Sequence, residues 1–390
     1  MGSINNMLKR FFLPLWILAS LSLFLYSYTQ VDLSLTLSRI SIYQTVEKGF
    51  QYVGWFNRPL STYLYIAVFS ILFILYFWTV KLVSEKKISR KIVWTAIFFV
   101  TGILFVSYNA FSYDLFNYIF DAKIVTFYHQ NPYLHKALDY PTDPMLSFMR
   151  WTHRTYPYGP GWLLLTVPLS FIGNNIFIVT FYLFKLLMAG FFLLTVYSIE
   201  KIGKVLKFSN VLLPVAAFAF NPFILSESLV SAHNDVVMMG LSMFGAYQLL
   251  DAKIFKGTVL YVFSIGIKFA TALVLLAFFI LVGIKKKNYF IAASVLMMIV
   301  AVLLATIRTN FQPWYLLYIA PFAALLFNKI YIKIPFIILS IAAVLYYIPF
   351  LFTGNWNVPI PSILNYIMIT AVVLSAIIIV GATPFNKRKS

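Results

Sequence analysis

The sequence predicts an all-α protein whose helices form a polytopic bundle in a membrane. Three observations support this: hydrophobic residues make up 62% of the chain, charged residues make up only 11%, and long apolar runs recur from end to end. A soluble domain carries roughly 25% charged residues, and an apolar run of about twenty residues is typical of a spanning helix. We therefore interpret residues 1–390 as a single membrane domain.

Taken in order, the apolar runs predict about ten full spans and two shorter elements that enter the membrane without crossing it. The first run follows a basic start and has no small-residue cleavage site after it, which indicates an uncleaved span. The predicted spans lie near residues 11–28, 60–82, 92–110, 176–199, 210–229, 236–250, 289–307, 314–328, 333–352 and 363–382.

The two shorter elements are predicted where an apolar run does not fit one crossing. A helix over 161–199 would be roughly 58 Å long at 1.5 Å per residue, so the break at 173–175 indicates that 162–172 dips into the outer leaflet and returns. Lysines lie at both ends of 257–284, which favours a hairpin of two half-helices turning near 266–268 over a single tilted span.

The net charge of +19 is distributed as in a membrane protein rather than a nucleic-acid-binding protein. Twenty of the 30 basic residues fall in short clusters on one side of the predicted spans. The positive-inside rule makes this side cytoplasmic, both termini included. The clusters lie at 9–10, 81–91, 201–207, 253–256, 285–287, 329–333 and 387–389.

The groups that could carry chemistry gather on the other side, which is the outer face. Eight of the 11 acids and all four histidines lie there, whereas the absence of cysteine excludes disulfides and thiol catalysis. The longest hydrophilic segment, 111–161, is also outside. Because it is rich in Tyr, Phe, Trp and Pro, we expect an ordered extracytoplasmic loop that carries an active site.

Two groups of candidate residues lie in this loop. Asp114, at the outer end of the third predicted span, is either a base at the edge of the low-dielectric region or a helix-capping acid. The segment 150–160 contains Arg154, Tyr156 and Tyr158, which suit either the binding of a phosphate or docking at the lipid headgroups.

Further candidates lie outside the loop. His233, Asn234 and Asp235 form a short outer turn; they are too few for a closed metal site, and a loop turn alone would also explain them. Lys268 interrupts an apolar stretch, which marks a candidate functional residue, and Lys185 raises the same question. Arg308 is either functional or a membrane-boundary anchor.

Several sequence segments that contain or adjoin these candidate residues occur in the order seen in the GT-C superfamily of membrane glycosyltransferases. Over residues 100–320 the chain resembles the polyprenol-phosphate-mannose-dependent mannosyltransferases. The resemblance implies a GT-C-like fold and the inverting transfer of a hexose, mannose in first place, from a polyprenyl-phosphate carrier to an extracytoplasmic acceptor. The segments are SYDLFNYIFDAKI, NPY with YPYGP, AFNPFILSESLVSAHND, IGIKFATALVLL and FQPWYLLYIAP.

The resemblance also implies roles for single residues. GT-C enzymes keep an essential acid in their first large outer loop, and Asp114 matches it, although an additional outer segment, 29–59, precedes this loop here. Because a lipid phosphate leaves readily, the site needs a base and cations. We expect Asp114 as the base, Lys268 and Arg308 on the donor phosphate, with Arg154 and His233 as second choices, and Asp235, Asn234, Tyr113, Tyr156 and Tyr158 around the acceptor and sugar.

The expected partners are membrane lipid, a polyprenyl-phosphate-linked sugar and a glycan or glycolipid acceptor, in a bacterial or archaeal plasma membrane. No nucleic acid, metal ligand set or cofactor is predicted, and nothing in the sequence indicates a divalent metal. The alternative is a transporter or flippase of the lipid-linked sugar, because broken helices and intramembrane cations also occur there. Against it, the chain shows no internal repeat, and its polar residues gather at one face.

Overall fold

The computed structural model describes residues 2–386, with side chains described except for residues 2–9, 287 and 382–386. The protein is 76% helix. The described residues contain no strand, and their one isolated bridge joins Lys136 to Thr155. The all-α prediction is therefore confirmed. The last basic cluster, 387–389, and the side chain of Lys9 lie outside the described residues.

Within residues 2–386, six helices are long and apolar enough to cross a membrane, which fits a multi-pass membrane protein. They belong to α1 (Gly2–Tyr28), α3 (Arg58–Ser84), α7 (Phe177–Val205), α13 (Phe290–Thr309), α15 with α16 (Ile330–Leu345 and Ile348–Thr353) and α17 (Ile360–Asn386). A seventh crossing results if α8 (Leu212–Ala219) and the segment Pro222–Val230, bent by 57°, are counted as one span.

Three further predicted spans are shorter helices: α4 (Arg90–Phe105), α10 (Asp235–Leu250) and α14 (Leu316–Leu325). A helix of 16 residues, the length of α4 and α10, rises only about 24 Å, less than the roughly 30 Å of a hydrocarbon core. Helix α4 ends early because the chain turns before α5 (Asp114–Thr126). The Ser107 hydroxyl donates to the carbonyl of Leu104, and the Asn109 side chain donates to the carbonyl of Ser112.

Both interruptions of long apolar runs lie at the residues predicted for them. Asn174 and Asn175 have left-handed backbone angles (φ 47° and 57°), and they separate α6 (Pro160–Gly173) from α7. Lys268 is extended (φ −144°, ψ 135°) between α11 (Ile254–Ile267) and a 3₁₀ turn that leads into α12 (Ala272–Gly283).

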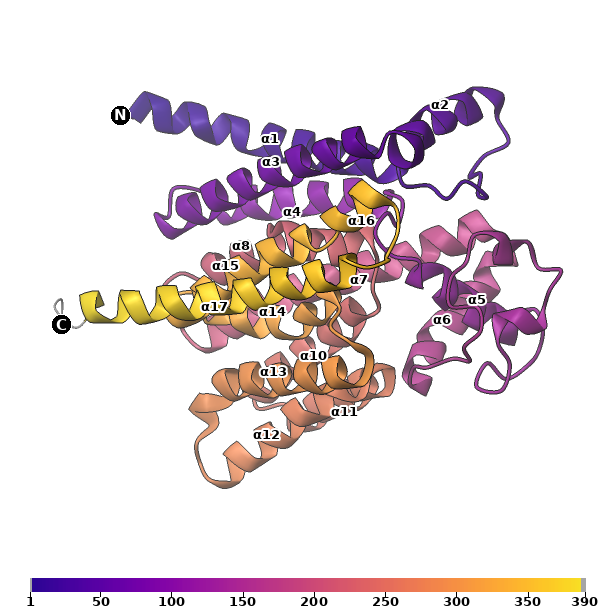
Figure 1. Ribbon diagram of the computed structural model, residues 1–390. Helices are drawn as coiled ribbons and strands as arrows, with labels where there is room; N and C mark the ends of the chain where they lie inside the picture. Colours follow the sequence, from indigo (N-terminus) through magenta and orange to yellow (C-terminus); the bar gives the residue numbers. More distant parts are fainter. Residues whose placement is uncertain (1, 387–390) are drawn as a thin grey trace.

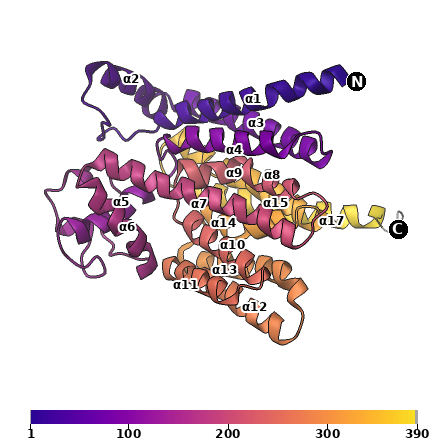
Figure 2. The same ribbon diagram turned by 180° about the vertical axis from the view of Figure 1, so that it is seen from behind.

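The two ends of the molecule hold different elements. The start of α1 and the end of α17 lie at one end of the bundle, whereas α2 (Ser41–Gln51), α5 (Asp114–Thr126) and α6 lie at the other (Figures 1 and 2). The segment 111–161 is ordered there, around α5 and the 3₁₀ turns Ala137–Asp139 and Pro144–Ser147.

The end of this segment is attached directly to the break in the helical bundle before Lys268. The backbone N–H of Gly159 donates to the carbonyl of Ile267 at 3.1 Å. A Cβ on Gly159 would lie 2.2 Å from the carbonyl oxygen of Gly266, and one on Gly161 would lie 2.7 Å from its carbonyl carbon. Only glycine permits this approach, which brings the segment 150–160 beside Lys268.

The buried cation Lys185 has a structural role. Its ammonium group donates to Ser107 Oγ at 3.2 Å, to the carbonyl of Val230 at 3.1 Å and to the carbonyl of Leu229. These two carbonyls end the π-helical turn Ser226–Val230, where helical partners run out. Lys185 therefore stabilises the end of a broken helix.

Candidate active site

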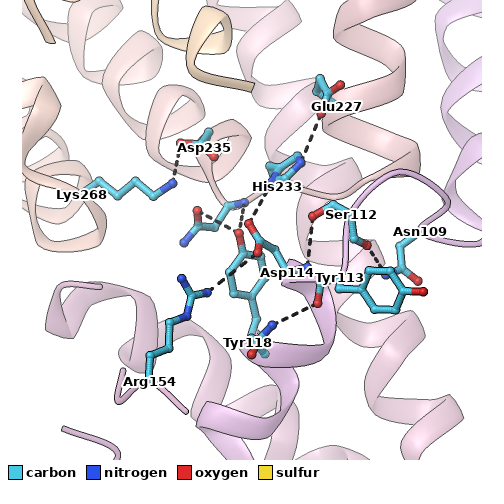
Figure 3. Close-up of polar contacts among 12 residues, drawn as sticks. Asn109, Ser112, Tyr113, Asp114, Tyr118, Arg154, Glu227, His233, Asp235 and Lys268 are labelled. Atoms are coloured by element: carbon cyan, nitrogen blue, oxygen red, sulfur yellow. Dashed lines mark hydrogen bonds and ion pairs between the residues drawn. The ribbon is translucent and has the colours of Figure 1, made fainter. Parts of the chain in front are cut away.

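Polar side chains from four separate parts of the chain meet where the segment 111–161 contacts the helical bundle (Figure 3). Asp114 comes from the start of α5, and Arg154 comes from the segment before α6. His233 lies in the turn before α10, Asp235 is the first residue of α10, and Lys268 lies at the break after α11. We call these five residues the polar cluster. Its ion pairs join groups that lie up to about 120 residues apart in the sequence.

Asp114 is the first residue of α5, where the helix dipole favours a carboxylate. Its backbone N–H donates to Ser112 Oγ at 3.1 Å. Its Oδ2 lies 3.5 Å from His233 Nδ1, and its Oδ1 lies 3.9 Å from Arg154 Nη2. Burial acts to raise the pKa of Asp114, but His233 and Arg154 outweigh it and hold this pKa below its usual value. Asp114 is therefore ionised near neutral pH.

His233 is fully buried between two carboxylates. Its Nε2 lies 3.2 Å from Glu227 Oε2, opposite the contact with Asp114, and its ring stacks on Trp314 with centroids 4.2 Å apart. Burial acts to lower the pKa of His233, but the bonds to Asp114 and Glu227 prevail and raise it to about 9. The side chain is an imidazolium at neutral pH.

Lys268 forms the second ion pair of the polar cluster. Its ammonium lies 2.6 Å from Asp235 Oδ1 and 5.4 Å from the ring centroid of Tyr158. The side chains of Lys268 and Arg154 remain 18% and 35% exposed, unlike that of His233. These two cations are therefore the ones that a ligand can reach.

Several buried polar atoms at or beside the polar cluster have no hydrogen-bond partner among the described residues. Leaving a buried polar atom unpaired destabilises a protein by about 1–3 kcal/mol, so a concentration of them indicates a place where a polar ligand binds. They include Arg154 Nη2, Trp162 Nε1, Ser231 Oγ, Asn234 Nδ2 and Asp235 Oδ2.

The remaining predicted site residues divide into two groups. Tyr158 and Asn234 lie at the polar cluster, the former under Lys268 and the latter accepting from the Tyr118 hydroxyl at 3.3 Å. The hydroxyls of Tyr113 and Tyr156 are engaged elsewhere, on Asp32 Oδ2 at 2.9 Å and on the carbonyl of Gly159 at 2.8 Å.

Arg308 is not joined to the polar cluster. It lies exposed in the last turn of α13 and makes no ion pair or hydrogen bond with the described part of the chain, but its charge acts on the Tyr315 hydroxyl, which Asp114 and Asp235 also influence. Its neighbour Thr309 shares a hydrogen bond of 2.6 Å with the hydroxyl of Tyr315.

Sequence reasoning missed five residues at or beside the polar cluster. Glu227 is an acid inside an apolar run, and the rule that singled out Lys268 applies to it equally. Asp121 follows Asp114 by two helical turns and so lies on the same side of α5; burial raises its pKa to about 7. Tyr118 and Trp314 lie in segments that carry the resemblance, and Asp32 is one of the outer acids. No pattern singled them out as site residues, because their roles depend on contacts between distant segments.

No three His, Asp or Glu side chains within residues 2–386 are grouped as ligands of a metal ion.

A family model described as alpha-(1→6)-mannopyranosyltransferase, N-terminal domain, matches residues 33–285. This range covers well over half of the chain. It contains the whole polar cluster and Glu227, whereas Arg308 and Trp314 lie beyond it. No curated protein and no solved structure matches the chain.

Proposed function

The chain belongs to the alpha-(1→6)-mannopyranosyltransferase family, and we propose that it transfers mannose from a polyprenyl-phosphate carrier to an acceptor outside the membrane. Family membership makes the protein a membrane glycosyltransferase. The observation that supports the finer proposal is the polar cluster itself, in which an ionised carboxylate lies beside two accessible cations.

The carboxylate of Asp114 acts as the general base in this proposal. It takes the proton of an acceptor hydroxyl, whose oxygen bonds to the anomeric carbon of the mannosyl group. The bond between that carbon and the phosphate oxygen breaks on the opposite face, which inverts the configuration, and polyprenyl phosphate leaves with the bonding electrons. Such a displacement requires one base and a stabilised leaving group.

The leaving phosphate is assigned to Lys268 and Arg154, because both are reachable and both lie beside Asp114 or Asp235. A guanidinium binds phosphate oxygens in a bidentate manner, and an ammonium adds a point charge. His233 is enclosed between two carboxylates and is therefore assigned to holding Asp114 rather than to the phosphate. Arg308 is exposed and forms no ion pair with an acid of the cluster, so it is a less favoured phosphate ligand.

The sugar and the isoprenoid chain are assigned to neighbouring surfaces. Asn234 Nδ2 and Asp235 Oδ2, both unpartnered, suit the hydroxyl groups of a hexose. The exposed apolar side chains of α6, Leu164, Phe171 and Ile172, suit the first isoprene units of the carrier.

The test of this proposal is transfer by the purified protein in liposomes that contain polyprenyl-phosphate-[14C]mannose and a mannose-ended glycolipid. The wild type is expected to move the label to the glycolipid. Asp114→Asn, which keeps the shape but removes the base, should lower the rate by about 10²–10⁴-fold.

Asp139→Asn is the matched control, since Asp139 is a half-exposed acid of the same segment whose ion pair with His135 lies away from the polar cluster. It should transfer at the wild-type rate. Near-normal transfer by Asp114→Asn would remove Asp114 from the mechanism. Passage of the labelled carrier across the bilayer without a new glycosidic bond would favour a flippase instead.

A further inference from the structure

Glu227 has no part in the proposed reaction, although it is 1% exposed and lies in a π-helical turn inside an apolar segment. We propose that Glu227 is a positioning residue that acts on Asp114 through His233. This inference rests on the proposed function, because it explains how the base of that reaction is held. It assigns a contribution to catalysis to a carboxylate that does not touch the substrate.

A continuous series of contacts joins the two carboxylates. Asp114 Oδ2 lies 3.5 Å from Nδ1 of His233, and Nε2 of the same ring lies 3.2 Å from Glu227 Oε2. Beyond it, the Tyr347 hydroxyl donates to Glu227 Oε1 at 3.0 Å. Figure 3 shows His233 between Glu227 and Asp114. Each ring nitrogen therefore faces one carboxylate at ion-pair distance, although neither nitrogen has a hydrogen bond of good geometry among the described residues.

The plane of the imidazole is fixed independently of these acids. The ring stacks on Trp314 at an interplanar angle of 18°, and the backbone N–H of His233 donates to the carbonyl of Glu227 at 3.1 Å. Rotation of the ring is thereby restricted, so its nitrogens keep facing the two carboxylates. A carboxylate facing each nitrogen favours a proton on both, whereas a single facing carboxylate would allow a neutral tautomer.

Glu227 has no substitute at Nε2 among the described residues. Arg154 lies on the far side of Asp114, and Lys268 is paired with Asp235. Lys185 is directed at the carbonyls of Leu229 and Val230 rather than at the Glu227 carboxylate. Tyr347 contacts Glu227 and not the ring.

Loss of Glu227 should change the charge of His233, which lies beside the proposed base Asp114. Replacing Glu227 with glutamine removes one of the two negative charges that keep His233 protonated. The imidazole then loses its proton at a lower pH, and Asp114 loses the cation that fixes its position and keeps it ionised. Transfer should fail at an alkaline pH where the wild type still works.

The first experiment measures transfer against pH in Glu227→Gln. The alkaline limb of the activity profile should move to lower pH by about one unit or more. Because Glu227 acts through His233, the double variant Glu227→Gln with His233→Gln should be no slower than His233→Gln alone. An unmoved limb, or losses that add in the double variant, would overturn the proposal.

Glu200→Gln is the matched control. Glu200 is a buried glutamate of α7 whose partners, Arg90 at 2.8 Å and Lys204, are distant from the polar cluster. Its replacement removes an equally buried charge, so it should leave the pH profile unchanged. A general effect of losing any buried carboxylate would instead move both profiles.

The second experiment needs no substrate. The ¹⁵N signals of the His233 ring, identified by their loss in His233→Gln, are followed against pH in wild type and in Glu227→Gln. A midpoint lowered by about one pH unit or more supports the proposal, and an unchanged midpoint overturns it. This titration can be read even if the wild type transfers no mannose. It therefore separates the failure of this inference from the failure of the proposed function.

If Glu227→Gln does not fold, Tyr347→Phe tests whether Glu227 controls the protonation of His233. It removes only the hydroxyl that donates to Glu227 and keeps the ring that packs against Phe111. The freed Glu227 oxygen then attracts the His233 proton more strongly, so the His233 midpoint should rise rather than fall. A midpoint that stays in place would show that Glu227 does not control the imidazole.

Discussion

Single residues of the same type have different roles at this site because their partners differ. Lys185 and Lys268 are both lysines in apolar segments, where a charge is unfavourable and indicates a function. Lys185 is fully enclosed and bonds backbone carbonyls, so its role is structural. Lys268 remains partly exposed and pairs with one oxygen of Asp235, whose other oxygen accepts no hydrogen bond of good geometry within the described residues.

Lys268→Ala should therefore weaken the use of the donor. A hydrogen bond to a charged group contributes about 1.5–3 kcal/mol, so kcat/KM for the polyprenyl-phosphate sugar should fall by about 10–150-fold. Lys268→Arg should recover part of this loss. Arg308→Ala, which removes an exposed cation outside the cluster, should change kcat/KM little; the reverse ranking of the two alanine variants would place the phosphate at Arg308.

Asp121 makes the stability of the protein depend on pH near neutrality. Burial raises its pKa to about 7, above the ordinary value of 3.8. A group raised in this way contributes stability that is fully present below pH 3.8 and is lost as the pH rises through about 7. Asp121→Asn, which stays neutral, should not show this loss.

The measurement is the melting temperature of the detergent-solubilised protein between pH 5 and 8. The difference between Asp121→Asn and wild type should grow in favour of the variant as the pH rises. Two parallel curves would show that Asp121 titrates at its ordinary pKa in the folded protein.

At the level of helices, the site is built from interruptions. The polar cluster takes its residues from the start of α5, from the segment before α6, from the turn into α10 with its first residue, and from the extended residue after α11. Non-helical backbone at such depth is tolerated only where protein or a polar cavity surrounds it. The close approach of Gly159 to Gly266 supplies this protein contact, and it joins the segment 150–160 to the break that carries Lys268.

Gly159→Ala should therefore disturb the site without touching a charged residue. The added methyl would lie 2.2 Å from a backbone oxygen, so the two segments must separate. Such overpacking destabilises by about 1–3 kcal/mol, and transfer should fall because Arg154 and Lys268 move apart. Gly190→Ala in α7 is the control, since its methyl would meet no atom within 4 Å. Equal activity of the two variants would contradict this account.

At the scale of the whole molecule, the sequence predicted local features better than it predicted which residues come together in space. Apolar runs predicted the helical class, and the polar residues at 173–175 and Lys268 predicted both interruptions, because these properties depend on neighbours in the sequence. The number of membrane crossings was harder to predict, because α4, α10 and α14 are apolar but short. The length of a helix in a bundle depends on its packing against other helices. Arg308 matched the same pattern as Lys268, and only the fold separates them from each other.

The charge distribution supports a proposal for the orientation of the protein in the membrane. Basic clusters accompany the end that holds the start of α1 and the end of α17, and the segment 111–161 lies at the opposite end (Figure 1). From the positive-inside rule we propose that the polar cluster faces outward, where a lipid-linked donor would take the place of a nucleotide sugar.

Because the chain has no cysteine, single cysteines report this orientation directly. Ser147→Cys lies exposed in the segment 111–161, and Ser84→Cys lies exposed at the end of α3 beside the cluster 81–91. A membrane-impermeant maleimide should label Ser147→Cys in intact cells and Ser84→Cys only after permeabilisation. Labelling of both after permeabilisation shows that each site is reactive. The opposite pattern in intact cells would place the polar cluster in the cytoplasm, where the donor would no longer need a lipid carrier facing outward.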